Sequence, residues 1–377
     1  MITGFENNHH MFCLDRPMTA QTVSNGVVLP RKDVESGPMW GLGGVCDADG
    51  NFVELSAYDG GWATHGGAYP YDTSEYIDED VVYFGPFFPH WGHFLVDLIG
   101  RMWYIARFGR KKVVYLGEDA PRGNFLECFR LLGLEEGDLI PVTKPTRFRS
   151  VTVPEFSCFS CRWYSREYRE MFDTMIAAAS PWEIPGKKIY FSRLDFGRGK
   201  EVGEKQIADW ALTNGFTAVA PEKLSVAQQI AIWNNAEEIL CLDGSIPISI
   251  AFSRKEDLQL TVLHKTSLEH QNLELFLLMR PCRVTLLDAF REPFRGYPKN
   301  IGAGPFLLEI GEDILRYSQR RGWVVPYSAG QLARIRFGNT FRLLWRIWNL
   351  PLKCRIALSR LLPAGLKKKL REVLGRG

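Results

Sequence analysis

Three polar side chains recur at every fourth position of an otherwise apolar segment, and their types suit proton transfer. His93, Asp97 and Arg101 would share one face of a helix that we expect from His90 to Phe108. Buried polar groups need partners, so the three residues could form a structural ion-pair network. Alternatively, His93 is a general base, and Asp97 either orients the imidazole ring or accepts the proton itself. His90 would then be a second candidate base, and Arg101 would contact the substrate that gives up the proton.

A second group of candidates follows four short apolar strands in the second half of the chain. We expect these strands at residues 188–191, 216–219, 239–242 and 258–263, with helices between them. Strands that alternate with helices indicate a parallel sheet, and such sheets bind ligands beyond the carboxyl ends of their strands. The turns at those ends hold Ser192 and Arg193, then Pro221, Glu222 and Leu224, then Asp243, Gly244 and Ser245, then His264 and Lys265.

The first of these turns offers cations that could bind a phosphate group. The planar guanidinium of Arg193 can bind two phosphate oxygens at once. Arg198 and Lys200 lie on the same loop and could assist. The alternative is a charged loop that contacts only solvent.

The other turns could complete a nucleotide site. Gly244 and Ser245 open a helix, whose backbone N–H groups and dipole would favour a phosphate, although a tight turn also explains the pair. Asp243 could bind a ribose or sugar hydroxyl, or cap the helix. The second turn would hold the base through backbone groups and Leu224, or Pro221 simply ends the strand.

The order of the elements predicts an α/β fold with two domains. Met1 to Asp80 is irregular and rich in glycine, and a regular α/β pattern follows it. Pro181 and Pro185 end a helix that we expect at residues 166–179, and they mark a domain boundary. We expect five regions: 1–80 packed on the first domain, 81–182 as the first α/β domain, 183–290 as a Rossmann-like domain, 291–330 as a closing segment, and 331–377 as a basic amphipathic tail.

Composition restricts the class of protein. A chain of 377 residues with 46% apolar and 24% charged residues can form two soluble domains, each with its own core. The start of the chain lacks a signal-peptide pattern, and no apolar run is long enough to span a bilayer. Eight cysteines are too few for a disulfide scaffold, and we expect a reducing, cytoplasmic setting. Cys158 and Cys161 form a lone C-x-x-C, which more often packs than binds zinc.

Charge is concentrated at the C-terminal end. Residues 331–377 hold 12 Lys or Arg and one acid, whereas the rest of the chain holds 34 basic and 42 acidic residues. Apolar residues, including two tryptophans, alternate with the cations in residues 334–376. This pattern suits the anionic surface of a membrane, although helices packed on the body with a basic outer face would look similar. No nucleic-acid motif accompanies the tail, so we expect no nucleic-acid partner.

The order and spacing of several short motifs resemble the family 61 glycosyltransferases. The matching pieces are Ile189–Arg193, Arg198, Glu204, Gly215–Phe216, Pro221–Ser225, Gln228–Ile230, Ala236, Asp243–Ser245 and Phe252, with Gly92–Asp97 resembling the family's signature in the first domain. Two positions depart from the usual pattern. Gly203 precedes Glu204 where the family often has Asn, and Asp243 stands where it often has His or Glu.

The resemblance implies a fold and an activity. The fold would be GT-B-like, with two facing Rossmann-like domains. The enzyme would be an inverting, metal-independent transferase without a cofactor, using a nucleotide sugar bound on the second domain. The acceptor, a bacterial surface polysaccharide or lipid-linked glycan, and the base would lie on the first domain. The resemblance also favours the catalytic role of His93 and Asp97, since they coincide with the signature. The basic tail suits the membrane surface where such acceptors reside, so we expect a peripheral location on the inner face of the cell membrane.

Two other functions remain open on sequence alone. Another nucleotide-sugar enzyme, such as an epimerase, would bind the same donor and turn it over without an acceptor. A non-catalytic partner in glycan assembly could keep the fold and bind no nucleotide. Donor turnover and nucleotide binding therefore discriminate among the three.

Overall fold

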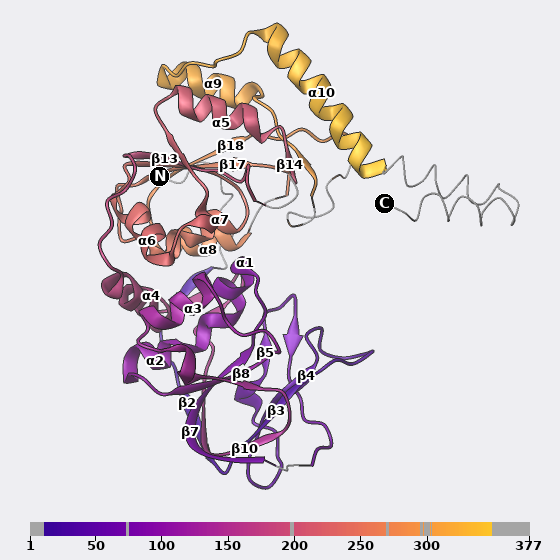
Figure 1. The fold of residues 1–377 in the computed structure, drawn as a ribbon, viewed down its shortest axis with the longest axis vertical. Helices are drawn as coiled ribbons and strands as arrows, with labels where there is room; N and C mark the ends of the chain where they lie inside the picture. The colour runs from indigo at the N-terminus through magenta and orange to yellow at the C-terminus, as the bar shows by residue number, and fades with distance from the viewer. Residues whose placement is uncertain are drawn as a thin grey trace, which may run out of the picture. The chain divides into compact units, whose positions relative to one another are not determined.

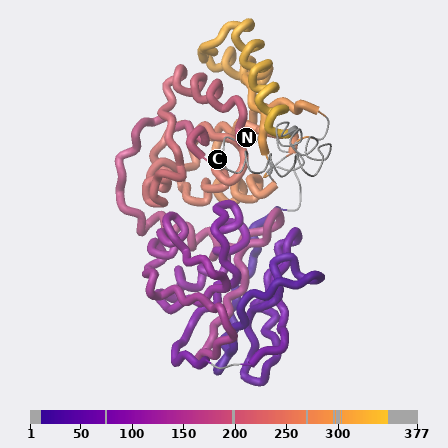
Figure 2. The backbone as a smooth tube through the Cα atoms, turned by 45° about the vertical axis from the view of Figure 1, so that its right-hand side comes forward, coloured from indigo at the N-terminus to yellow at the C-terminus, as the bar shows by residue number. Residues whose placement is uncertain are grey.

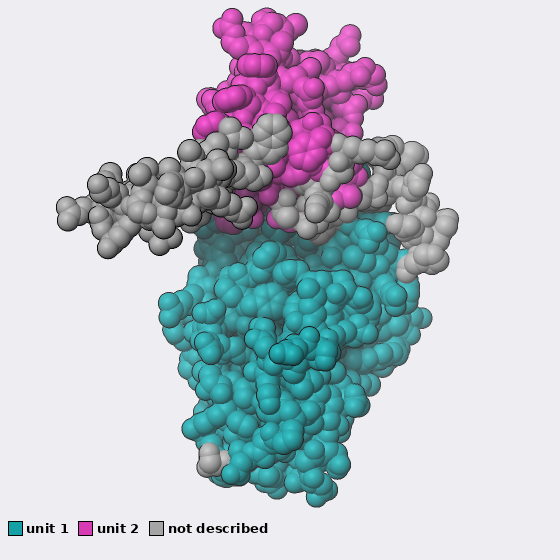
Figure 3. All heavy atoms as spheres, turned by 90° about the vertical axis from the view of Figure 1, so that its right-hand side faces the viewer, with its two compact units in different colours: residues 1–192, 215–263, 269–286 teal, residues 193–214, 264–268, 287–377 magenta. Residues whose placement is uncertain are grey.

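A computed structural model describes residues 11–72, 75–196, 200–268, 271–294, 297, 302 and 304–348. The chain divides into two compact units, drawn in teal and magenta in Figure 3. Unit 1 comprises residues 1–192, 215–263 and 269–286, and unit 2 comprises residues 193–214, 264–268 and 287–377. Both mix helices with strands, which confirms the α/β class. The five expected regions stay predictions.

The first sheet of unit 1 has seven strands. Six of them have the order β4-β3-β10-β7-β8-β9, and the seventh, β2, also pairs with β10. Neighbours β10, β7, β8 and β9 run parallel, whereas β2 and β3 run antiparallel to β10. Strands from before residue 47 and after residue 145 therefore lie side by side (Figures 1 and 2). The strands are β2 (Ala20–Ser24), β3 (Val27–Lys32), β4 (Leu42–Cys46), β7 (Glu75–Pro86), β8 (Lys112–Leu116), β9 (Leu139–Val142) and β10 (Thr146–Pro154).

The helix expected from His90 to Phe108 is instead a series of helical turns of different type. The series is α1 (Trp91–His93), the π-helical turn η2 (Phe94–Leu98), the 3-10 turn η3 (Ile99–Arg101) and α2 (Trp103–Phe108). The helix expected at residues 166–179 is confirmed as α4 (Arg166–Ala178), and α3 spans Asn124–Leu131. Phe84 of β7, Phe94 of η2 and Phe129 of α3 are fully buried in the core, where the ring of Phe129 contacts the other two.

The second sheet has the order β15-β13-β16-β17-β18, and pairs β15-β13, β13-β16 and β16-β17 are parallel. Its strands are β13 (Lys188–Phe191), β15 (Thr217–Val219), β16 (Glu238–Leu242), β17 (Gln259–His264) and β18 (Arg283–Asp288). This confirms the four strands expected from sequence. In chain order the sheet reads 2-1-3-4-5, and the order reverses between β13 and β16. Doubly wound sheets bind ligands at that reversal.

Within unit 1, the layer that contains the first sheet is hydrogen-bonded to the layer that contains the second sheet. A capping box formed by Ser225 and Gln228 begins α6 (Val226–Asn235). Glu127 of α3 accepts hydrogen bonds from the backbone N–H of Val226 at 2.8 Å and of Ala227 at 2.9 Å. A carboxylate at this position also favours the helix dipole. The remaining elements of unit 1 are β1 (Phe12–Leu14), η1 (Glu54–Ser56), β5 (Tyr58–Asp59), β6 (Thr64–His65), η4 (Glu136–Asp138), β11 (Cys158–Phe159), β12 (Trp163–Ser165), η5 (Pro221–Lys223), α7 (Ser245–Ile248), η6 (Ser249–Phe252) and α8 (Gln271–Met279).

Unit 2 is built from β14 (Glu201–Val202), α5 (Glu204–Thr213), β19 (Phe306–Leu307), α9 (Glu312–Arg321) and α10 (Ala329–Trp348). The departure at Gly203 has a steric reason, because its φ is +102° and a Cβ there would lie 2.3 Å from the carbonyl oxygen of Leu308. The part of the predicted tail after Trp348 lies outside the described residues. No helix in the described ranges is both long enough and apolar enough to cross a bilayer.

Prediction: acid should destabilise unit 1 through His65, which is 2% exposed and donates from Nδ1 to Trp40 O at 3.1 Å. Burial lowers its pKa to about 4. The unfolded ring binds a proton near pH ~6.5, so the stability that depends on neutral His65 is present above that pH and lost as pH falls towards 4. The loss should reach about 3 kcal/mol.

Unfolding by urea at a series of pH values measures this effect. The variant His65→Gln should show a flatter pH dependence than the wild type. Identical slopes in the two proteins would contradict the assignment.

Candidate functional site

The centre of the candidate site is the pair His93 and Asp97. His93 Nδ1 lies 2.8 Å from Asp97 Oδ2, with side-chain exposures of 34% and 2%. The pair spans the π-helical turn η2, and such turns are frequent at functional sites. His93 Nε2 makes no hydrogen bond to any described residue. One nitrogen is therefore fixed by the carboxylate, while the other stays available to a ligand.

Two aromatic donors complete the surroundings of Asp97. The hydroxyl of Tyr58 and the indole Nε1 of Trp62, the latter at 3.3 Å, both donate to Asp97 Oδ1. Burial raises the pKa of Tyr58 well above its usual range, and the Asp97 carboxylate adds to the shift. Tyr58 therefore stays a proton donor. Because the carboxylate only accepts when ionised, Nδ1 of His93 carries the proton and Nε2 has a free lone pair.

Aromatic rings surround the imidazole of His93. Trp62 stacks on it with ring centroids 4.9 Å apart and an interplanar angle of 22°, and Trp40 meets it edge-on at 6.1 Å. The Trp62 side chain is 45% exposed. Such a ring offers an apolar surface to the face of a sugar. His90 caps α1 by accepting the backbone N–H of His93, and its proposed role as a second base stays a prediction.

The helix of His93 touches the helix that follows β16. A Cβ built on Gly92 would lie 3.4 Å from the Cβ of Ser245, and Trp91 Nε1 donates to Ser249 Oγ at 3.0 Å (α1 and α7 in Figure 1). Ser245 was expected at a phosphate and His93 at an acceptor. Within unit 1, the structure brings these two predicted groups into neighbouring positions.

The predicted donor residues at the strand ends flank the reversal of the second sheet. Ser192 follows β13 and donates its backbone N–H to Val219 O at 2.8 Å, while Asp243 follows β16 and is 1% exposed. Asp243 Oδ1 accepts the backbone N–H of Gly244 at 2.6 Å, and Gly244 has a φ of +132°. The carboxylate therefore shapes the turn before α7, and only glycine takes this backbone conformation without strain.

The turn after β15 forms η5. The carbonyl oxygens of Pro221 and Leu224 accept hydrogen bonds from Gln229 Nε2, at 3.0 and 3.4 Å, and Leu224 O also accepts from Asn124 Nδ2 at 3.1 Å. Glu222 is exposed. The turn is thus fixed by its neighbours, and its binding of a base stays a prediction.

The predicted cations after β13 belong to unit 2. Arg193 Nε donates to Glu201 Oε1 at 3.1 Å, and Lys265 Nζ lies 3.7 Å from the same oxygen. The Nη atoms of Arg193 make no hydrogen bond within the described chain. Lys200 is exposed, and Arg198 lies outside the described residues. Unit 2 therefore brings Arg193 and Lys265 to one buried carboxylate.

Arg101 does not join His93 and Asp97 in a hydrogen-bonded network. Its side chain is fully buried and donates to the carbonyl oxygens of Leu55, Ala57, Phe84 and Pro154 at 2.8–3.2 Å. Burial lowers the pKa of its guanidinium to about 10. This placement ties η1, β7 and β10 together, and acceptor binding by Arg101 stays a prediction.

Sequence reasoning did not identify Tyr58, Trp62 and Glu201 as members of the site, and it placed Lys265 in a candidate turn without giving it a role. The aromatic pair lies in the irregular region before residue 80, where only the high aromatic content was a signal. Lys265 stands in a turn that the strand pattern marked, but nothing in the sequence linked it to Glu201. Among the described residues, no group of three or more His, Cys, Asp or Glu is arranged to hold a metal ion, and Cys158 is buried.

Comparison with models of protein families shows what part of the chain is similar to a known family. The family model described as Glycosyltransferase 61 matches residues 91–259, a range that includes His93, Asp97 and the turns after β13, β15 and β16. No curated protein matches the chain.

Prediction: Arg101→Leu should destabilise unit 1 by more than about 3 kcal/mol, because the substitution leaves buried carbonyl oxygens without donors. Urea unfolding would measure the change in free energy. Arg101→Lys, which keeps the charge and fewer donors, should give an intermediate loss. A stable Arg101→Leu protein with wild-type unfolding would show that the guanidinium is not a structural anchor.

Proposed function

Residues 91–259 belong to the glycosyltransferase 61 family, and from that premise we propose how this transferase works. The enzyme moves a sugar from a nucleotide-sugar donor to a hydroxyl group of a bacterial surface polysaccharide or lipid-linked glycan, with inversion and without a metal. The observation that carries this proposal is the His93–Asp97 pair. Nε2 of His93 makes no hydrogen bond within the described residues, and the preceding residue, Gly92, lies beside Ser245 at the reversal of the second sheet.

The proposed reaction is a single displacement. His93 Nε2 accepts the proton of the acceptor hydroxyl while the oxygen attacks the anomeric carbon of the donor. The new glycosidic bond forms as the bond to the nucleotide diphosphate breaks, and the diphosphate leaves with the bonding electron pair. Because attack comes from the face opposite the leaving group, the configuration inverts. The Asp97 carboxylate stabilises the imidazolium that forms and keeps the ring oriented.

Charge on the leaving diphosphate needs stabilisation as the bond breaks. We assign this role to the Nη groups of Arg193, which is held at Nε by Glu201. Lys265, next to the same carboxylate, is a second candidate that the structure adds. Asp243 and the turn of Gly244 and Ser245 would contact the phosphate or sugar.

Helix α10 supports the proposed peripheral location on the inner membrane face. Phe337, Phe341 and Trp345 are 77%, 61% and 48% exposed and are spaced four residues apart, so they form one stripe. Leu343 on the opposite side is fully buried in unit 2. The described part of the helix carries arginines and no acidic residue, which suits anionic lipid headgroups.

Prediction: His93→Gln should lower kcat by at least about 10²-fold, because the acceptor loses its base. Asp97→Asn should lower kcat while leaving donor affinity near the wild-type value, since it removes orientation and charge but not binding. Transfer of radiolabelled sugar measures kcat, and calorimetry measures nucleotide affinity.

The variant His90→Gln tests the other predicted base, three residues away at the start of α1, and it should keep near-wild-type kcat if His93 is the base. Wild-type kcat in His93→Gln, with the fold intact, would sink the mechanism. Donor turnover that does not require an acceptor would favour an epimerase-like enzyme instead.

Prediction: replacing Phe337, Phe341 and Trp345 together by Ser should weaken binding to vesicles of anionic lipid by at least about tenfold, since each buried aromatic ring contributes about 1.5–3 kcal/mol. Vesicle sedimentation measures the binding. Phe108→Ser removes an aromatic side chain that is 56% exposed on unit 1 and serves as the control. Equal binding by the triple variant and the control would contradict the role of α10.

A further inference from the structure

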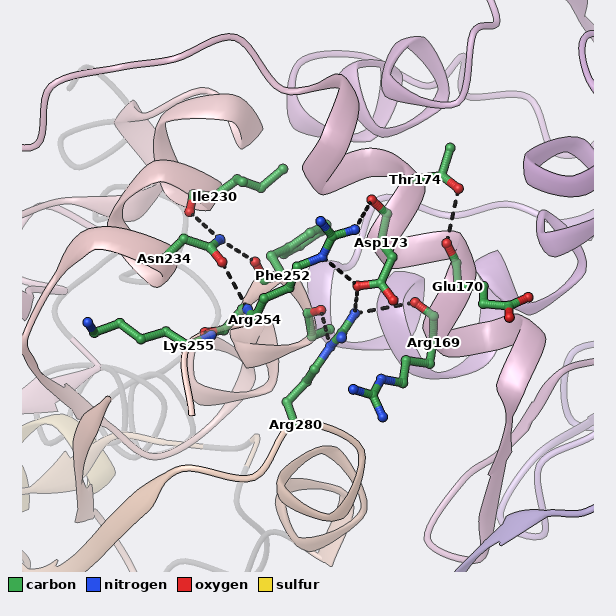
Figure 4. Close-up of polar contacts among 12 residues, drawn as sticks. Arg169, Glu170, Asp173, Thr174, Ile230, Asn234, Phe252, Arg254, Lys255 and Arg280 are labelled. Atoms are coloured by element: carbon green, nitrogen blue, oxygen red, sulfur yellow. Dashed lines mark hydrogen bonds and ion pairs between the residues drawn. The ribbon is translucent and has the colours of Figure 1, made fainter. Parts of the chain in front are cut away.

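A polar cavity of about 190 Å³ lies in unit 1, among residues that the proposed reaction does not use. Arg169 and Asp173 come from α4, Arg254, Lys255 and Glu256 from the segment after η6, and Arg280 from the turn after α8 (Figure 4). Its charged lining comprises these four cations and two carboxylates. The excess of positive charge is the first sign of a ligand.

Arg280 is held deep in the wall of this cavity. Its side chain is 4% exposed, with Nε donating to Ala251 O at 3.1 Å and Nη2 donating to Asp173 Oδ1 at 2.8 Å and Arg169 O at 3.3 Å. Nη1 makes no hydrogen bond to a described residue. Burial lowers the pKa of this guanidinium, and the nearby cations Arg169 and Arg254 lower it further. A partly desolvated cation with unused N–H groups favours an anion.

The carboxylates in and near the cavity do not neutralise all of its cations. Asp173 Oδ1 serves both Arg280 and Arg254, whose Nε lies at 2.9 Å. Lys255 pairs with Asp257 at 3.1 Å, and Glu256 is exposed. The guanidinium of Arg169 makes no hydrogen bond or ion pair within the described chain. Figure 4 shows Arg254 and Arg280 converging on Asp173 from different segments.

We infer that this cavity is a binding site for an oxyanion of the phosphate class, held by Arg169, Arg280 and Lys255. The forked guanidinium groups match the tetrahedral oxygens, and a cavity of about 190 Å³ has room for such a group. The anion would be inorganic phosphate or the phosphate group of a metabolite. Arg254 contributes charge but is already bonded to Asp173 through Nε and Nη2.

The site is separate from the proposed donor site. Arg254 and Lys255 precede β17, whereas Asp243 follows β16. Because these strands are parallel, the two sites lie at opposite ends of the strands of one sheet. A short path still joins them. The segment α7–η6 begins at Ser245, beside Gly92, and near its end the carbonyl of Ala251 is held by Arg280. An anion in the cavity would therefore tie α4, η6 and the end of α8 together and stabilise unit 1.

Thermal unfolding of the full chain in phosphate, compared with chloride at matched ionic strength, tests the inference. Phosphate should raise the melting temperature, and titration should give a dissociation constant. That constant should rise about tenfold or more in Arg169→Gln and in Lys255→Gln, because each loses a charge-assisted contact. Arg166→Gln is the control, since Arg166 lies on the same helix, pairs with Glu170 and is 82% exposed outside the cavity.

A parallel titration with a hexose 1-phosphate identifies the source of the anion. A response to inorganic phosphate supports a free anion, and a response to the ester alone supports a metabolite. Equal dissociation constants in Arg169→Gln, Lys255→Gln and Arg166→Gln would overturn the inference, because the phosphate would then bind elsewhere, for example at the donor turns. No response to either compound would overturn it as well. Neither result bears on the roles of His93 and Asp97.

Discussion

The candidate site depends on the hydrogen bonds that the buried carboxylate of Asp97 accepts. A carboxylate that is 2% exposed is tolerated only when its oxygens accept hydrogen bonds, and here Tyr58, Trp62 and His93 supply them. These donors come from two parts of the chain, so satisfying one charge also fixes the N-terminal region against the helical segment of His93. Trp62 is held over the imidazole by the same bond. Ring orientation, aromatic wall and choice of tautomer therefore have a single cause.

A second constraint is the close approach of the two layers of unit 1. Gly92 lets α1 lie against Ser245 at the start of α7, and Glu127 of α3 caps α6. The proposed base, His93, and the reversal point of the second sheet are consequently parts of one compact unit. The cationic cavity around Arg280 lies at the opposite end of the strands of that sheet, and the segment α7–η6 connects the two ends. Catalysis and anion binding would then act on the same short helical segment.

The sequence predicts well those features that local patterns decide. The strands β13, β15, β16 and β17, the helices α5 and α6 between them, and the helix α4 follow from apolar periodicity and end signals. It fails where tertiary contacts decide. The segment from His90 to Phe108 was expected as one helix, but buried contacts of Asp97 and Arg101 accompany changes of helical type. Tyr58 and Trp62 lie more than thirty residues before Asp97 in the chain, with strand β7 between them, and such a distant pairing carries no periodic signal.

The ring ¹⁵N chemical shifts of His93 test most directly whether Asp97 prepares this histidine to accept a proton. At a pH where the ring is neutral, we predict a protonated Nδ1 and an unprotonated Nε2, because the carboxylate accepts from Nδ1. In Asp97→Asn this preference should be lost or weakened. A neutral His93 that carries its proton on Nε2 in the wild-type protein would contradict the proposed role of His93 as the base.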